Sequence, residues 1–152
     1  MIVWHWRSFD ELTVHELYAI LALRQDVFNV EQICSEPDID HRDKQAQHLL
    51  GLQNNQLVAY LRLFEPDSVY PGAMSIGRVV TAQSARGQGI GKEAMQQAML
   101  HIEKSGNTAP IVISAQIYLT QFYESFGFRT EGEPYDEAGI IHIKMRKLST
   151  LR

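Results

Sequence analysis

The spacing of hydrophobic positions divides the chain into strands and helices. Short stretches of alternating apolar and polar residues predict strands, whereas apolar residues three and four positions apart predict helices. Thr13 and Glu16 have the spacing of a capping box, which marks the start of the first helix. Asn54 and Asn55 predict a hairpin turn, because asparagine tolerates a left-handed backbone. The expected elements are strands at 2–7, 48–53, 56–65, 74–81, 110–115, 128–133 and 140–148, and helices at 14–28, 89–103 and 118–126.

The order of these elements predicts the fold class. The helix over 89–103 carries one apolar stripe, formed by Ile90, Ala94, Met95, Ala98, Met99 and Ile102. The strand over 110–115 is continuously apolar, as expected of a central strand covered on both faces. Polar segments at 34–47 and 134–139 predict loops. We therefore expect one α/β domain over residues 1–152, with a central mixed, mostly antiparallel sheet flanked by helices on both faces.

Composition and charge exclude several classes of protein. The 152 residues fit one domain, and 14 basic against 18 acidic side chains give a net charge of −4. This balance argues against nucleic-acid binding, which typically needs a basic stripe. The apolar runs are far shorter than the roughly 20 residues that span a bilayer, and the first residues do not resemble a signal peptide. We therefore expect a cytoplasmic protein with no membrane partner.

The cysteine and histidine content argues against a metal centre. Cys34 is the only cysteine, so an internal disulfide and a cysteine-rich zinc site are excluded. The six histidines do not have the spacing of a metal-ligand pair. We therefore expect no metal cofactor.

A glycine-rich segment between a strand and an amphipathic helix predicts an anion site. Glycines let backbone N–H groups approach a phosphate closely, and the helix start adds partial positive charge. A Walker A motif would need glycine at Arg86 and a hydroxyl residue at Glu93, and a dinucleotide motif would need glycine at Lys92. Neither motif is present. The segment consists of Arg86, Gly87, Gln88, Gly89, Ile90, Gly91 and Lys92.

The pattern of Arg86, Gly89 and Gly91 resembles the Arg/Gln-x-x-Gly-x-Gly signature of the GNAT superfamily of acyl-CoA-dependent N-acyltransferases. The resemblance implies that residues 86–92 bind the pyrophosphate of coenzyme A. It also implies that the preceding strand offers backbone groups to the pantetheine arm through Val79, Val80 and Thr81. Gln116 stands where the family often has asparagine, and we expect it to bond the pantetheine amides.

A second segment, Phe122 to Phe128, resembles the family's Phe-Tyr-x-x-x-Gly-Phe motif. The resemblance implies that the hydroxyl of Tyr123 protonates the departing thiolate of coenzyme A. A phenol with an ordinary pKa near 10 is protonated at neutral pH and can donate this proton. The alternative is that Tyr123 anchors a short helix in the core.

The N-terminal half resembles the ElaA-like branch of GNAT proteins, through residues 23–32, Asp38 to Asp40 and His48 to Leu50. Acyl-homoserine-lactone synthases, which share the fold, have a similar segment near residue 23. The downstream spacing fits the ElaA-like group better.

Acylation of an amine also needs a group that takes a proton from the incoming ammonium. Glu31 and Asp40 are the candidates we favour, beside Asp38, Glu65 and His48. For these groups the alternatives are a solvated helix end, turn chemistry or a structural histidine.

Two arginines on predicted elements also need an explanation. Arg78 lies in the middle of a strand, where a charge needs a polar surrounding or a partner. Arg78 is a candidate for positioning a substrate carboxylate or carbonyl. His48 is a second candidate for contact with the substrate. The alternative for Arg78, and for Arg24, is a structural ion pair.

These observations predict an enzyme that transfers acetyl from acetyl-CoA to a primary amine by direct attack in a ternary complex. The acceptor is expected to be a small-molecule or peptide amine, and a homodimer through sheet edges is possible. One alternative is an acyl-homoserine-lactone-type synthase with a longer acyl donor. Another is a non-catalytic acyl-CoA sensor, although Tyr123 favours an enzyme.

Overall fold

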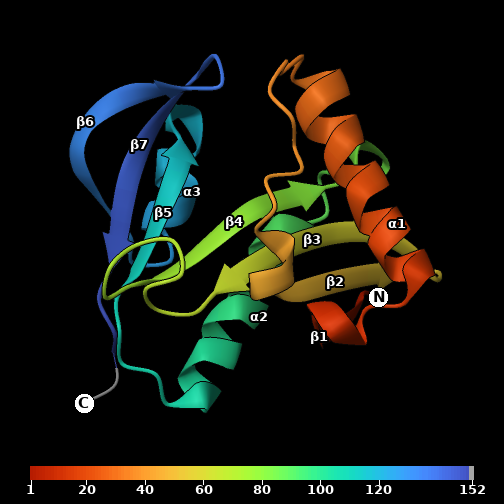
Figure 1. Cartoon of the computed structure of the whole chain (residues 1–152), viewed down its shortest axis with the longest axis horizontal. Coiled ribbons are helices and arrows are strands. Elements are labelled where there is room, and N and C mark those ends of the chain that lie inside the picture. Colours follow the sequence, from red (N-terminus) through yellow and green to blue (C-terminus); the bar gives the residue numbers. More distant parts are fainter. Residues whose placement is uncertain (151–152) are drawn as a thin grey trace.

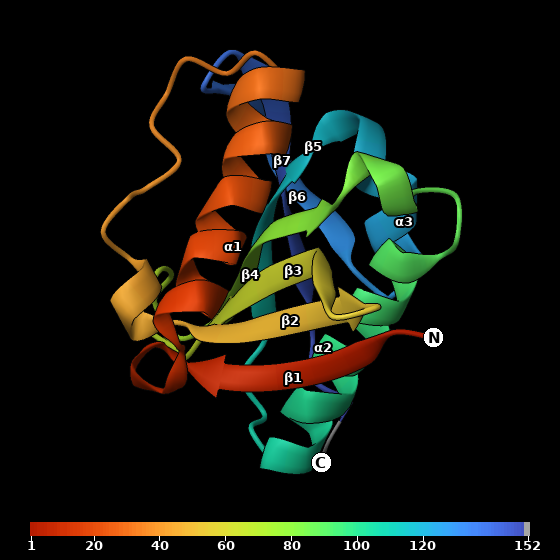
Figure 2. The same cartoon turned by 90° about the vertical axis from the view of Figure 1, so that its right-hand side faces the viewer.

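The computed structural model describes residues 1–150, which form one mixed sheet with helices on both faces (Figures 1 and 2). The strands lie in the order β1-β2-β3-β4-β5-β7-β6, and every neighbouring pair is antiparallel except β4 with β5. Their bounds are β1 Val3–Ser8, β2 Gln47–Gln53, β3 Gln56–Phe64, β4 Met74–Thr81, β5 Ile111–Gln116, β6 Arg129–Glu137 and β7 Ile140–Lys147. The predicted fold class is confirmed.

Three α-helices are accompanied by shorter helical turns in the described chain. The capping box of Thr13 and Glu16 is present, with backbone-to-side-chain bonds of 3.0 and 2.9 Å. The first helix is α-helical only to Arg24 and continues as a π-helical segment, so the single α-helix predicted over 14–28 is a composite. The bounds are α1 Val14–Arg24, η2 Gln25–Glu31, α2 Ile90–Ser105 and α3 Thr120–Glu124, with shorter turns η1 Phe9–Glu11, η3 Asp43–Gln45, η4 Gln83–Ala85 and η5 Ile117–Leu119.

The loop predicted over 134–139 is wrong, because β6 continues through most of it. Gly132 has a φ of 77°, and the register with β7 shifts between Glu131 and Tyr135, as in a β-bulge. Pro134 is tolerated because β6 lies at the edge of the sheet, where an N–H donor is not needed on the outer side. The turn itself is reduced to Ala138 and Gly139.

Neighbouring residues of each strand pack on opposite faces of the sheet. Leu50 contributes to the core beneath α1, with Ile20 and Leu23 from that helix. Leu49 contributes to the core beneath α2, whose predicted apolar stripe is buried at all positions except Met99, which is partly buried. The two helices therefore hold opposite faces of the central strands (Figure 2).

Strands β4 and β5 separate soon after they begin (Figure 1). In the described chain they pair only at Met74 with Ile111 and at Ser75 with Val112. We call the unpaired parts, residues 76–81 of β4 and 113–116 of β5, the β4–β5 fork. The register of β4 with β3 also shifts here, and Arg78 has a φ of 51°, so β4 bulges beside the fork.

Candidate functional site

The glycine-rich turn forms the start of α2 and is joined to β4 of the fork by η4. Gly87 and Gly89 have φ values of 81° and 73°, which non-glycine residues rarely adopt. Gly89 is the N-cap of α2 and makes no side-chain capping bond, and a Cβ at either glycine would meet no described atom within 4 Å. A helix start with uncapped N–H groups and open space around its glycines fits an anionic group such as a pyrophosphate.

The side chain of Arg86 binds Glu31 at the end of η2. Two guanidinium nitrogens donate to the two carboxylate oxygens at 2.5 and 2.8 Å, and the same guanidinium donates to the Thr81 carbonyl at 3.2 and 3.3 Å. The hydrogen bonds from Arg86 lower the pKa of Glu31. With this lowered pKa, Glu31 is a weaker base than a glutamate without a partner, which argues against the proton-accepting role expected for it. Arg86 ties the turn to η2 and β4.

The three cofactor candidates on β4 connect the fork to this turn. Val80 is buried beneath α1, whereas Val79 packs on the side of α2. The hydroxyl of Thr81 lies 3.5 Å from where a Cβ on Gly91 would be. Of the three strand residues, Thr81 is thus the one whose side chain lies beside the turn, whereas Val80 is part of the core.

Tyr123 on α3 is buried among aromatic side chains. Its ring meets those of Phe122 and Phe128 edge to face, with centroids 5.1 and 6.1 Å apart. Burial raises the pKa of Tyr123 to about 12, with a smaller contribution from Tyr118, so the phenol is protonated at neutral pH. Within residues 1–150 its hydroxyl shows no hydrogen bond, which leaves the proton available for donation.

Gln116 ends β5 and reaches across to the segment after η2. Its amide exchanges two hydrogen bonds with Gln32, at 3.2 and 3.5 Å, and its oxygen accepts a further bond from the Tyr118 hydroxyl. Gln116 is thus at the open end of the fork, as a pantetheine contact requires. Binding a ligand there would exchange these bonds for new ones.

Six charged side chains form a closed ring on the α1 side of the sheet. Each aspartate contacts two arginines, and each arginine contacts two aspartates. We call the set the charged ring, and its members in order are Arg24, Asp38, Arg78, Asp40, Arg62 and Asp43.

The ring joins α1, the 34–47 loop, β3 and β4. Arg24, with no exposed surface, lies 2.7 Å from Asp38 and 2.8 Å from Asp43. Arg78 at the β4 bulge lies 2.8 Å from Asp38 and 3.6 Å from Asp40. The structural ion pairs considered for Arg24 and Arg78 are therefore present, and the guanidinium of Arg78 is held by the protein rather than directed at a substrate.

The ring argues against Asp40 as the proton acceptor. Burial alone would raise its pKa, but the hydrogen bond and charge of Arg62 outweigh burial and hold the pKa of Asp40 well below its usual range. The pKa of Asp43 is lowered in the same way by Arg24 and Arg62 against the effect of burial. These carboxylates hold structure, so the catalytic role expected for Asp40 is not supported.

His48 is fully buried, which contradicts the expected contact with substrate. Its Nε2 donates to the Asp43 carbonyl at 2.9 Å, so Nδ1 accepts from the Tyr60 hydroxyl at 2.5 Å. Burial lowers the pKa of His48 and keeps the ring neutral. Instead, His48 has a structural role, because its hydrogen bond to the Asp43 carbonyl helps to hold a member of the charged ring.

A polar cluster on β5, β6 and β7 escaped the sequence analysis. Ser114 contacts the Tyr135 hydroxyl and donates to Glu137 Oε1 at 3.0 Å, and Nε2 of His142 lies 3.3 Å from Glu137 Oε2. These residues come from three strands. Two of them, Tyr135 and Glu137, lie within the segment 134–139, which was predicted to be a loop. No local sequence signal marks the cluster.

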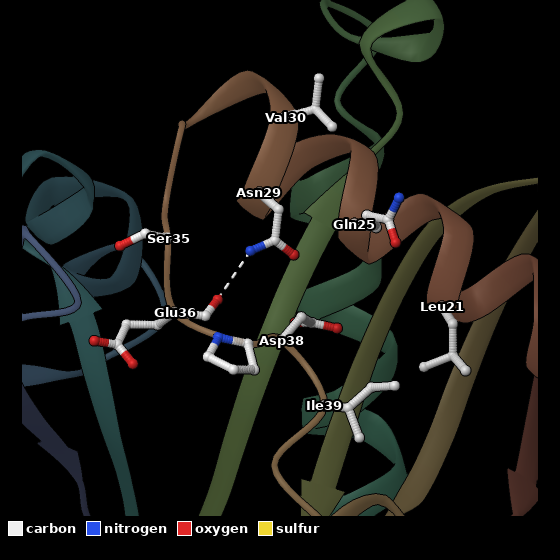
Figure 3. Close-up of a pocket in the computed structure, with 9 residues that line it drawn as sticks. Leu21, Gln25, Asn29, Val30, Ser35, Glu36, Asp38 and Ile39 are labelled. Carbon is white, nitrogen blue, oxygen red and sulfur yellow. Dashed lines mark hydrogen bonds between the residues drawn. The ribbon is translucent and has the colours of Figure 1, made fainter.

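A surface pocket of about 410 Å³ lies between the first helix and the loop that follows it (Figure 3). Leu21, Gln25 and Asn29 form one wall, and residues 35–39 form the other. Asn29 donates to the carbonyl of Glu36 at 2.9 Å and so fixes the loop across the pocket.

Among residues 1–150, no group of three or more His, Cys, Asp or Glu side chains is placed to hold a metal ion. No described helix is both long and apolar enough to cross a bilayer.

Comparisons with known proteins point to one family. The model of an acetyltransferase (GNAT) domain matches residues 21–149. A UPF0039 protein of Synechocystis is 43% identical over 145 residues, covering 95% of this chain and 94% of that protein. ElaA of Escherichia coli is 39% identical over 149 residues, covering 97% of both chains. The crystal structure of an acyl-CoA N-acyltransferase from Pseudomonas aeruginosa superposes with a TM-score of 0.91 at 40% identity, covering 97% of this chain and 99% of that one.

Proposed function

Because this chain belongs to the GNAT acetyltransferase family and resembles its ElaA branch, we propose that it transfers acetyl from acetyl-CoA to a primary amine. The observation that carries the proposal is the uncapped start of α2, where Gly87 and Gly89 leave open space for a pyrophosphate. The acyl-CoA N-acyltransferase of Pseudomonas aeruginosa, with a nearly identical fold, supports the same class of donor.

The fork offers a path for the rest of the donor. On the side that faces the fork, the backbone groups of β4 beyond Ser75 and of β5 beyond Val112 have no strand partner and are free to bond the pantetheine amides. The side chain of Gln116 can also bond these amides after it releases Gln32. Tyr123 supplies the proton that the thiolate needs as the C–S bond breaks. The reaction is direct attack of the amine nitrogen on the thioester carbonyl carbon.

The test compares two glycines at opposite ends of α2. Gly89 and Gly106 have φ values of 73° and 74°, and a Cβ at either would meet no described atom within 4 Å. Gly89→Val and Gly106→Val therefore impose similar backbone strain, but only the first obstructs the proposed phosphate site. Calorimetry should show CoA binding weakened more than tenfold, about 1.4 kcal/mol, for Gly89→Val alone. Equal CoA affinity in the two folded variants would show that the turn is not part of the CoA-binding site.

Donor length and turnover separate this proposal from its alternatives. An acetyltransferase should release thiol from acetyl-CoA faster than from octanoyl-CoA when a primary amine is present. Preference for octanoyl-CoA would favour a synthase with a longer acyl donor. Tight CoA binding without thiol release would favour a sensor.

A further inference from the structure

We propose that Ser114, Tyr135, Glu137 and His142 form the acceptor subsite, in which Glu137 binds a cationic primary amine and relays its proton to His142. The proposal rests on the proposed function and names the substrate class and the base for it. We call these four residues the acceptor cluster.

The acceptor cluster lies where the fork opens. Val112 is the last residue of β5 paired with β4, and Ser114 is the next residue on the same face. Ile113 and Ala115 point into the core beneath α2, so Ser114 faces the α1 side. On β4, Gly77 occupies the equivalent position, two residues beyond Ser75.

Space for a ligand is present at this level of the fork. A Cβ on Gly77 would meet no described atom within 4 Å. The φ of Gly77 is not in the left-handed region, so its backbone conformation does not require glycine. The missing side chain therefore leaves room beside the strand on the face that Ser114 shares.

Glu137 differs from the carboxylates considered above in its partners. Glu31, Asp38, Asp40 and Asp43 are each held by arginine. Among the described residues, Glu137 pairs with no arginine or lysine; its contacts are Ser114 and His142, and half of its side chain is exposed. It thus keeps an unbalanced negative charge and a free approach, which suits an ammonium group.

The hydrogen bonds of His142 define where a proton can go. Its Nδ1 donates to the Ile140 carbonyl at 2.8 Å, so in the neutral ring Nε2 carries a lone pair. The Nε2 atom lies 3.3 Å from Glu137 Oε2. Nε2 can therefore take a proton from Glu137, and the resulting imidazolium is stabilised by the carboxylate beside it.

Other titratable groups surround the acceptor cluster. Lys144 on β7 is the cross-strand partner of Ser114, and its Nζ lies 5.4 Å from the centre of the Tyr70 ring. The pKa of Tyr70 is raised by burial and, less strongly, by Tyr135 and Glu137, whereas Arg42 lowers it. Cys34 donates to the carbonyl of Ala138 at 3.6 Å, at the turn that follows Glu137.

The ammonium gives one proton to Glu137, which passes it to Nε2 of His142 and then to solvent. The nitrogen lone pair forms the C–N bond, the C–S electron pair moves to sulfur, and sulfur takes the proton of Tyr123. The nitrogen then loses a second proton, which restores the Tyr123 phenol. The products are an N-acetyl amide, CoA thiol and one released proton.

The experiment compares Glu137→Gln with Glu133→Gln. Glu133 is an exposed carboxylate on the same strand and belongs to neither the cluster nor the turn. Thiol release from acetyl-CoA is measured against spermidine, tyramine and a lysine peptide, with CoA affinity measured separately by calorimetry. For the amine that wild type uses best, Glu137→Gln should lower kcat/KM by about 100-fold or more, with CoA affinity unchanged.

Conservative variants separate the charge from the fold. Glu137→Asp keeps the charge and should retain more activity than Glu137→Gln, and Ser114→Ala should fall between the wild type and Glu137→Gln. Equal losses in Glu137→Gln and Glu133→Gln, or no loss in Glu137→Gln, would overturn the proposal. Wild type that does not bind CoA, or that binds CoA but acetylates none of these amines, would refute the proposed function itself.

Discussion

Removing one carboxylate from the charged ring should destabilise the protein strongly. Asp43 is the sharpest choice, because one of its oxygens accepts bonds from Arg24 and Arg62, both at 2.8 Å. Asp43→Asn keeps the shape and one acceptor oxygen but removes the charge. Two buried guanidinium groups then face each other across a neutral amide.

The expected magnitude follows from the burial of all three groups. Arg24, Arg62 and Asp43 are 0%, 4% and 8% exposed, so water screens the two ion pairs of Asp43 poorly. Removing one partner of a buried pair costs about 3–5 kcal/mol, and the retained amide oxygen places Asp43→Asn near the lower value. A domain has about 5–15 kcal/mol of stability, so the variant should still fold.

Urea unfolding at neutral pH measures this loss. With a slope of about 1–3 kcal/mol per molar, a loss of about 3 kcal/mol lowers the midpoint by about 1–3 M. The matched control is Glu131→Gln, which breaks an ion pair with Arg146 on the surface and should cost no more than about 1 kcal/mol. An Asp43→Asn midpoint as high as that of Glu131→Gln would refute the reasoning.

Acid adds an independent check on the same variant. The folded-state pKa of Asp43 is lowered, so its contribution is present above the unfolded value of about 3.9 and is lost as the pH falls through the folded value. The stability difference between wild type and Asp43→Asn should therefore shrink as the pH drops below about 4. A difference that stays constant in acid would mean that charge is not its source.

Two further predictions concern catalysis and packing. Tyr123→Phe should lower turnover by about 100-fold and leave acetyl-CoA binding unchanged, because the proton is needed only as the C–S bond breaks; near-normal turnover, with chemistry shown to be rate-limiting, would reduce Tyr123 to a packing residue. Gly51→Ala would place a Cβ 2.5 Å from Cζ3 of Trp4, so the Trp4 ring or the β1–β2 pair must shift, and thermal unfolding should show a loss of about 1–3 kcal/mol; an unchanged melting temperature would show that the Trp4 ring moves aside freely.

Local signals in the sequence were sufficient for most elements and for the conformation of the glycine-rich turn. The capping box of Thr13 and Glu16 and the glycines at 87 and 89 act through backbone neighbours, so their roles can be derived from spacing alone. The extension of β6 was missed because Pro134 usually interrupts a strand, and only the edge position of β6 makes it acceptable.

Long-range pairing accounts for what could not be predicted from the sequence in the charged ring and in the polar cluster of β5, β6 and β7. Asp38 and Asp40 have the sequence context of turn residues, and nothing nearby indicates that three arginines from α1, β3 and β4 meet them. Glu137 depends in the same way on the register of β6 with β7, which brings it beside His142. Such groupings follow from topology rather than from local pattern.

The charged ring also bears on how the 34–47 loop moves. A segment without regular structure usually opens locally at little cost, and its amides exchange quickly with solvent. Here Asp38, Asp40 and Asp43 attach residues 38–43 to arginines of α1, β3 and β4, so the segment cannot lift away without separating buried opposite charges. The backbone amides of residues 38–43 should therefore exchange with solvent as slowly as those of the sheet beneath them. The loop then behaves as part of the cooperative core.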